Sequence, residues 1–184
     1  MRLPSIPMIL NSTNTQKVFA CLVKEPGREF LASEIQQATG ISKAGVYRSL
    51  EELVQENLIK KNSKGRVLFY SPQSQDSIVK QYKVLNTVTE LRKCVQQLKS
   101  SSRRIVLFGS AARGEDNKKS DIDLFILSKE PKITEKIISR VKFVKKIQVI
   151  IKTSSQLTEF ELKNKEFLNE INSGIVLWEE GDER

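Results

Sequence analysis

The 184-residue sequence contains no histidine, and this absence removes several kinds of chemistry. Without an imidazole, the chain cannot use histidine as a general base, as the activator of a nucleophile or as a ligand for zinc. Cysteine is scarce as well, because Cys21 and Cys94 are the only two and they form no Cys-x-x-Cys motif. So few thiols are typical of a reduced, cytoplasmic protein, and we expect that location.

Long apolar runs are also missing from the sequence. None approaches the roughly 18 residues that a membrane-spanning helix needs, and residues 1–10 contain no apolar segment typical of a secretory signal. Hydrophobic residues make up 39% of the chain and charged residues 29%, which is typical of a folded rather than a disordered protein. We therefore expect one or two small domains and no membrane partner.

The net charge of +9 is unevenly distributed. Residues 1–104 contain 17 Lys and Arg against 8 Asp and Glu, whereas residues 105–184 contain 14 of each. The whole positive excess therefore belongs to the first part of the chain. Clustered positive charge favours a nucleic-acid partner, although a basic surface that serves only solubility would give the same count.

The first 72 residues predict three helices followed by a β-hairpin. The helices are expected at 15–24, 33–39 and 43–56, and the strands at 58–61 and 66–70, with a turn at 62–65. In the second helix, Ile35 and Ala38 are expected to face inward. Gly40 can adopt the positive φ that ends this helix, and Ser42 is the expected cap of the third.

Residues 15–72 resemble the winged helix-turn-helix regulators of the ArsR-like kind, above all over residues 32–59. The resemblance implies a double-stranded DNA-binding domain whose third helix enters the major groove and whose hairpin, or wing, contacts the backbone or the minor groove. It implies that the DNA-facing residues are Ser42, Lys43, Ala44, Tyr47 and Arg48 on the helix, with Lys64 and Arg66 on the wing. Lysines and arginines would bind phosphates, while Tyr47 and Arg48 are the expected base readers. A winged helix that binds only protein is the alternative.

Residues 75–99 predict one long helix that links two domains. Its apolar residues follow alternating steps of four and three, at Val84, Val88, Leu91, Val95 and Leu98. This pattern fits either the seam of a homodimer or a helix that packs against one of the two domains.

The most specific motif lies between residues 105 and 127. A buried strand is expected to run into Gly109 and Ser110, where a short helix begins whose free N–H groups favour a phosphate. Arg113 can add a fixed cation one turn later. Asp121 and Asp123 are two apart at the start of a second apolar strand, so both carboxylates should project to the same face. Such a pair favours Mg²⁺ or Mn²⁺ together with the phosphates of an NTP.

The Gly-Ser pair, the ten residues that follow it, and the Asp-Ile-Asp between apolar strands resemble the nucleotidyltransferase superfamily that includes DNA polymerase beta and the minimal nucleotidyltransferases. The resemblance implies that Asp121 and Asp123 are catalytic and bind the metal. It also implies that the nucleotide is bound by Gly109, Ser110 and Arg113.

The superfamily completes its site with a third carboxylate on a later strand. The later strand of this chain, 146–151, has Gln148 at that position. An amide is no base and a poor ligand for a hard cation, so we expect metal and nucleotide binding with slow or no turnover. Glu159 and Glu161, on the next expected helix, are the nearest alternative acids.

As a whole, the sequence resembles a prokaryotic family that joins an ArsR-like winged helix to a minimal nucleotidyltransferase. The expected fold class is α/β in the sense of a two-domain α+β protein. It comprises a winged helix-turn-helix at 11–72, a linker helix at 75–99, and a nucleotidyltransferase-fold mixed sheet with flanking helices at 103–184. The resemblance implies a DNA-binding transcriptional regulator whose second domain binds a metal–nucleotide and is weakly active or inactive. Two alternatives stay open: an active transferase that moves NMP from NTP to a hydroxyl on protein, RNA or a small molecule, and an antitoxin-like partner of a small helical toxin.

Overall fold

The computed structural model describes residues 12–141, 143 and 145–181, and for residues 159–163 it describes the backbone alone. Residue 11, the expected start of the first domain, lies outside this range. The chain forms two compact units, Met1–Thr89 and Glu90–Arg184. Their boundary falls inside one continuous helix, α4 (Ser77–Leu98), which corresponds to the long helix predicted at 75–99.

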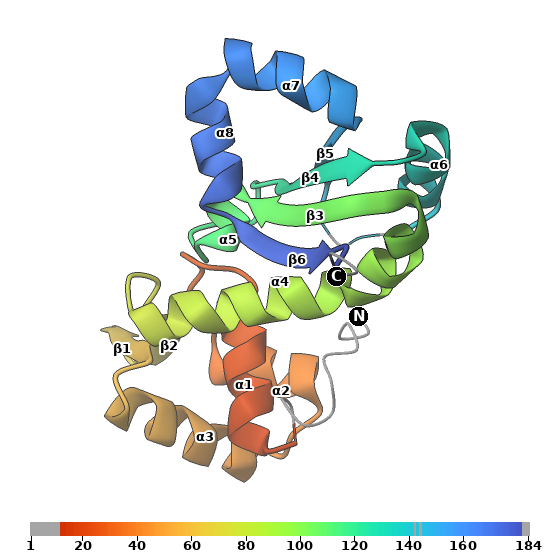
Figure 1. Cartoon of the computed structure of the whole chain (residues 1–184). Coiled ribbons are helices and arrows are strands. Elements are labelled where there is room, and N and C mark those ends of the chain that lie inside the picture. Colours follow the sequence, from red (N-terminus) through yellow and green to blue (C-terminus); the bar gives the residue numbers. More distant parts are fainter. Residues whose placement is uncertain (1–11, 142, 144, 182–184) are drawn as a thin grey trace. The chain divides into compact units, whose positions relative to one another are not determined.

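The first unit consists of helices followed by a hairpin, in the predicted order (Figure 1). Its elements are α1 (Asn14–Val23), α2 (Ala32–Thr39), α3 (Lys43–Gln55), β1 (Ile59–Lys64) and β2 (Val67–Pro72). Buried apolar side chains from every one of these elements form a single core, which includes Val18, Leu22, Ile35, Val46, Leu50, Leu53, Ile59 and Tyr70. The core fixes α3 against α1 and α2, because burial of each large apolar side chain stabilises the fold by roughly 1.5–3 kcal/mol.

The turn between α2 and α3 is built as the sequence predicts. Gly40 has a φ of 70° and donates its backbone N–H to the carbonyl of Gln36 at 2.9 Å, while the Ser42 hydroxyl accepts the N–H of Gly45 at 3.2 Å. The expectation that Ala38 faces inward is wrong, since Ala38 is exposed. It lies about 60° around the helix from Ile35, which carries it off the buried face of this short helix.

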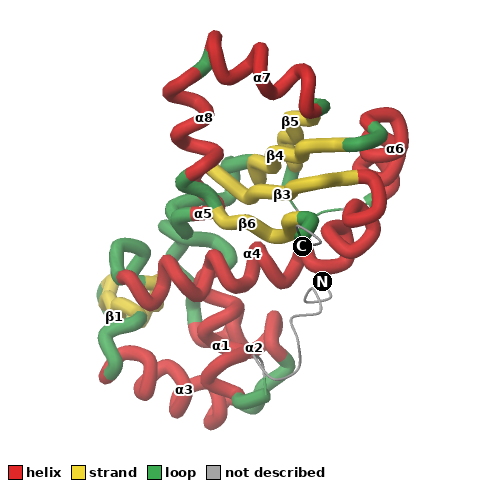
Figure 2. The backbone as a smooth tube through the Cα atoms, viewed as in Figure 1, coloured by secondary structure: helices red, strands yellow, loops and turns green. Residues whose placement is uncertain are grey.

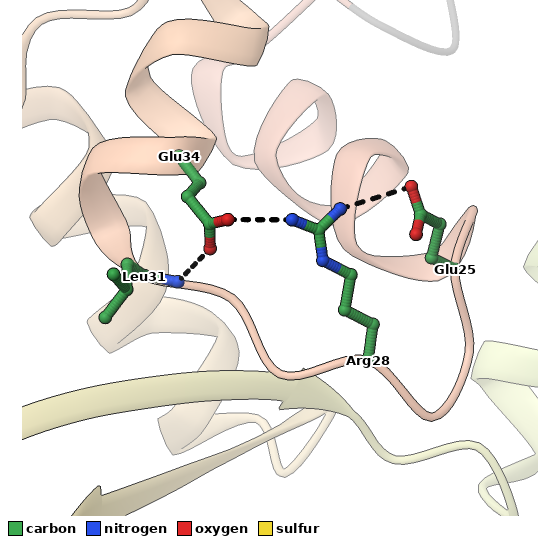
Figure 3. A network of polar contacts seen from close by, with 4 residues as sticks. All are labelled: Glu25, Arg28, Leu31 and Glu34. Atoms are coloured by element: carbon green, nitrogen blue, oxygen red, sulfur yellow. Dashed lines mark hydrogen bonds and ion pairs between the residues drawn. The ribbon is translucent and has the colours of Figure 1, made fainter.

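The loop between α1 and α2 is fixed by one arginine (Figure 3). The guanidinium of Arg28 lies 2.7 Å from a carboxylate oxygen of Glu34 and 3.3 Å from one of Glu25. The other oxygen of Glu34 accepts the backbone N–H of Leu31 at 2.8 Å. These contacts hold the start of α2 and the segment that leads into it.

The hairpin differs from the prediction in its turn. β1 runs to Lys64 and the turn has two residues, Gly65 and Arg66, rather than four at 62–65. Gly65 has a φ of 63°, as a tight hairpin turn requires at this position. All of β1 after Ile59 is exposed, so no alternation of buried and exposed residues marks this strand in the sequence.

The second unit is a mixed four-stranded sheet with flanking helices (Figures 1 and 2). Its strands are β3 (Ser102–Phe108), β4 (Ile122–Ser128), β5 (Ile147–Lys152) and β6 (Ile175–Glu179), in the order β5-β4-β3-β6. Its helices are the end of α4, the 3-10 helix η2 (Lys99–Ser101), α5 (Gly109–Ala112), α6 (Pro131–Arg140), α7 (Ser154–Lys163) and α8 (Lys165–Asn172). β4 and β5 are parallel, and α6 provides the crossover that a parallel pair requires. The mixed α+β class predicted from the sequence is therefore confirmed.

Helix α8 packs on the end of the central strand β3. The rings of Phe108 and Phe167 meet edge to face with their centroids 5.6 Å apart, and Ile171 joins the same buried cluster. Gly174 allows the return into β6, because a Cβ there would lie 2.5 Å from the carbonyl oxygen of Leu107. Figure 1 shows α5 and α8 at one end of the sheet and α6 at the other.

The apolar stripe of α4 is largely used within the chain. Leu91 and Leu98 are completely buried, and Val95 is 7% exposed. These three positions are therefore occupied by packing in the chain itself, which favours the second of the two readings of the stripe. Within the described residues, no helix is both long and apolar enough to cross a membrane.

Candidate functional site

The Gly-Ser turn lies directly beside one of the two aspartates. Phe108, the last residue of β3, is paired with Asp123 of β4 in the antiparallel register. The next residue, Gly109, has a φ of 70°, and a Cβ placed on it would lie only 2.5 Å from Oδ2 of Asp123. Glycine therefore both permits this backbone conformation and leaves the room that the Asp123 carboxylate occupies.

Asp121 is close enough to Asp123 for its charge to affect the pKa of Asp123. Asp121 lies one residue before β4 rather than on it, and Nζ of Lys146 is 3.2 Å from its Oδ2. The pKa of Asp123 is raised above its ordinary value, mainly by burial and then by the negative charges of Asp121 and Glu170. The negative charges of Asp121 and Asp123 thus repel each other, and a divalent cation would neutralise them.

Gln148 lies beside Asp123 on the neighbouring strand. The parallel register of β4 and β5 pairs these two residues, and paired residues in adjacent strands project to the same face of a sheet. Gln148 is exposed. This face therefore carries an amide next to Asp123, where a third carboxylate was expected from the resemblance. The side chains of Glu159 and Glu161, the alternative acids, lie outside the described part of the structure.

Arg113 is held by two carboxylates of the chain. Its Nε lies 3.0 Å from Glu115, and its Nη1 lies 3.6 Å from Glu170 of α8. These partners raise the pKa of the guanidinium, Glu115 foremost. The backbone carbonyl of Ser110 accepts the N–H groups of Arg113 and Glu115 at 3.2 and 2.9 Å, which closes the turn after α5. Arg113 was expected to be a cation directed at phosphate, whereas here it forms ion pairs within the chain.

These features lie within a segment that matches a known protein family. Residues 88–172 match the nucleotidyltransferase domain. The matched segment runs from the second half of α4 to the end of α8, and it contains the Gly109-Ser110 turn, both aspartates and Gln148. No curated protein matches the chain.

The acidic pair in the segment that matches the nucleotidyltransferase domain fits one hard cation. Asp121 and Asp123 supply two carboxylates, and Gly109 leaves room for that of Asp123. In the part of the chain that the structure describes, no three Asp, Glu, His or Cys side chains gather closely enough to hold a metal ion. Mg²⁺ is commonly bound by one or two carboxylates, with phosphate and water completing its shell. The pair therefore suits a cation that arrives with a nucleotide, and it offers few ligands for a second ion.

Sequence reasoning missed Glu170 and the ion pair of Asp116 with Lys145. Asp116 is buried and its carboxylate is bound by Lys145, which joins the loop before β4 to the segment before β5. The contact of Glu170 with Arg113 and that of Asp116 with Lys145 each join residues far apart in the sequence, so no local pattern predicts them. Charge alternation on α8 marks Glu170 only as a polar position.

In the first unit, the N-terminal half of α3 forms an exposed surface, which we call the α3 face. Its members are exposed and comprise Ser42, Lys43, Ala44, Tyr47 and Arg48. A hollow of about 310 Å³ lies between this helix and the start of α1. Another of about 350 Å³ lies toward the hairpin, lined in part by Lys43, Tyr47 and Arg66. Residues of α3 thus line both hollows.

The two cations expected on the hairpin differ in their surroundings. Lys64 forms an ion pair with Glu29, and its Nζ lies 5.1 Å from the centroid of the Phe69 ring. This pairing lowers the pKa of Glu29. Arg66 occupies the turn itself and is exposed. Lys64 thus forms contacts within the first unit that the sequence does not indicate.

Proposed function

We propose that this protein is a DNA-binding regulator whose nucleotidyltransferase domain binds a metal–nucleotide and transfers nucleotide slowly or not at all. The observation that carries the proposal is the α3 face, which presents Lys43, Tyr47 and Arg48 to solvent. The positive excess in residues 1–104 agrees with an anionic partner.

The order of elements in the first unit supports a winged helix-turn-helix domain of the ArsR-like kind. Three helices precede a hairpin, and the tight turn at Gly40 separates α2 from α3. In such domains, the N-terminal residues of the third helix contact base edges in the major groove. The basic residues Lys43 and Arg48 lie in that half of α3, whereas Glu51 and Glu52 follow in the other half.

Titration of the full chain with DNA tests this role. We expect the protein to bind a duplex taken from upstream of its own reading frame, and Lys43→Ala with Arg48→Ala to weaken binding at least tenfold at physiological salt. The matched control is Arg92→Ala with Lys93→Ala, which removes the same charge from exposed positions on α4. If the unmodified protein does not bind, or if the control weakens binding equally, DNA recognition by α3 is wrong.

The role of the second domain follows from Gln148. Asp121 and Asp123 can hold a cation that accompanies a nucleotide, but the amide beside Asp123 supplies no base and no strong ligand for a second ion. We expect Mn²⁺–ATP to bind to the full chain, and Asp123→Ala to abolish this binding. With labelled NTPs we expect no labelled product above the level of the Asp121→Ala variant.

An active transferase is a second candidate, because Asp121 and Asp123 are two carboxylates of the kind that metal-dependent phosphoryl transfer uses, and Gly109 leaves room for that of Asp123. Incubation with labelled NTPs, Mg²⁺ or Mn²⁺ and cell lysate would then label an acceptor, and Asp121→Ala would remove the label. Absence of label with all four NTPs excludes this candidate and leaves nucleotide binding as the role.

A further inference from the structure

Lys146 and Asp121 form an ion pair next to Asp123. The Nζ of Lys146 lies 3.2 Å from Oδ2 of Asp121, and the lysine side chain is 78% exposed. Lys146 is the residue before β5, and Gln148, the register partner of Asp123, follows two positions later. A cation of the chain itself therefore already contacts one of the two expected metal ligands.

The pairing of β4 with β5 fixes this position. Asp121 and Lys146 directly precede the first two paired residues of the parallel register, and the N–H of Ile122 donates to the carbonyl of Lys146 at 2.9 Å. The neighbouring Lys145 binds the buried Asp116, which ties the same segment to the loop before β4. Backbone pairing and a buried ion pair thus hold Lys146 beside Asp121, so its place does not depend on its own exposed contact.

The surroundings of Lys146 differ from those of Arg113, the cation expected to bind phosphate. Arg113 is paired with Glu115 and Glu170, neither of which is an expected metal ligand. The partner of Lys146 is Asp121, whose charge a divalent cation would neutralise on binding. An ammonium released in this way has three N–H donors and lies next to the phosphates that accompany the cation.

We propose that Lys146 binds the phosphates of the nucleotide, and that it exchanges Asp121 for them when the divalent cation takes this aspartate. The inference rests on the proposed binding of a metal–nucleotide. Without nucleotide, Lys146 opposes binding of a bare cation, because the ammonium and the cation compete for Asp121. With nucleotide, the same ammonium favours binding, so the site selects a metal–nucleotide over a free metal ion.

Removal of the Lys146 charge should therefore change two affinities in opposite directions. Lys146→Gln should tighten binding of Mn²⁺ alone, because no ammonium competes for Asp121. The same variant should weaken binding of equimolar Mn²⁺ and ATP, because the phosphates lose a cation. Each effect should be about two- to fivefold, in the range of exposed ion pairs. Titrations of the full chain measure both, with electron paramagnetic resonance for Mn²⁺ alone and calorimetry for Mn²⁺ with ATP.

Three further variants separate this exchange from a general effect of charge. Lys119→Gln removes an equal charge from an exposed position two residues before Asp121 and should leave both affinities unchanged. Lys146→Arg keeps the charge and should keep both affinities. In an Asp121→Asn background, Lys146→Gln should no longer tighten binding of Mn²⁺, because the charge for which the two cations compete is gone.

Loss of both affinities in Lys146→Gln would indicate general damage to the site and would overturn the inference. Tighter binding of Mn²⁺ with unchanged binding of Mn²⁺ and ATP would overturn it too, since Lys146 would then only compete with metal. Equal shifts in Lys119→Gln count against it in the same way. If Asp123→Ala abolishes binding of Mn²⁺ and ATP but Lys146→Gln behaves like the unmodified protein, the inference alone is wrong. If Asp123→Ala changes neither affinity, the proposed function of the domain is wrong as well.

Discussion

Gly109 and Asp123 approach so closely that any side chain on the glycine would meet the carboxylate, because a Cβ would lie 2.5 Å from Oδ2. Gly109→Ala should therefore displace Asp123 and weaken binding of Mn²⁺ at least tenfold. It should also lower the free energy of unfolding by about 1–2 kcal/mol, since φ is 70° at this position. Electron paramagnetic resonance and urea unfolding measure the two effects.

Gly40 provides the control for backbone strain. Its φ is also 70°, but a Cβ added there would meet no atom within 4 Å. Gly40→Ala should cost similar stability and leave Mn²⁺ binding unchanged. Equal loss of Mn²⁺ binding in both variants would mean that contact between Gly109 and Asp123 is not what matters.

Gln148 is the residue whose replacement should strengthen the site. Because it is paired with Asp123 in the parallel register, Gln148→Asp should add a carboxylate to the same face and tighten Mn²⁺ binding about tenfold. Without metal, the variant should unfold at a lower temperature than the parent, and Mg²⁺ should remove this difference by raising the melting temperature of the variant. The control is Gln148→Asn, whose side chain has the length of aspartate without its charge. Equal Mn²⁺ affinity of the Asp and Asn variants would contradict the expectation.

The raised pKa of Asp123 predicts a stability effect with a definite sign. The fold favours the protonated carboxyl, so the ionised form at pH 7 destabilises the protein in the absence of metal. Asp123→Asn should raise the melting temperature by a few degrees at pH 7 in EDTA. The gain should shrink as the pH falls toward about 4, where unfolded aspartate also takes up a proton. Calorimetric melts across this range test it, and a gain that grows on acidification would oppose it.

The two cations of the hairpin should differ in their contribution to DNA binding. Arg66 is exposed in the turn, whereas Lys64 is paired with Glu29. Arg66→Ala should reduce the slope of log affinity against log salt by about one, as for one lost phosphate contact. Lys64→Ala should reduce the slope much less. A larger effect for Lys64 would show that its pairing with Glu29 gives way on DNA.

The sequence predicts those parts of the fold that local chemistry decides. Ser42 caps α3 and Gly40 ends α2 because hydroxyl groups and glycine suit these backbone positions wherever they occur. The pairing of Phe30 with Tyr70 through backbone bonds of 2.8 and 2.9 Å, by contrast, follows from no local pattern. The Gly109 turn likewise follows from its motif, whereas Gln148 was placed in the site only by the resemblance to the superfamily, and its pairing with Asp123 is seen in the structure.

What the sequence could not reveal depends on contacts between distant segments. The ion pair of Arg113 with Glu170 needs the packing of α8 on Phe108, which no window around either residue contains. The same holds for Lys64 and Glu29. The hairpin turn was misplaced for a different reason, because an exposed strand lacks the apolar alternation by which strands are recognised.

The position of β3 between β4 and β6 has a consequence for folding during synthesis on the ribosome. β3 hydrogen-bonds to β4 along one side and to β6 along the other, yet β6 is translated after the other three strands of this described sheet. A nascent chain that has already paired β3 with β4 keeps the remaining side of β3 bare until residues 175–179 leave the ribosome. Unpaired strand edges attract other chains, so the protein is exposed to aggregation in the interval before β6 emerges.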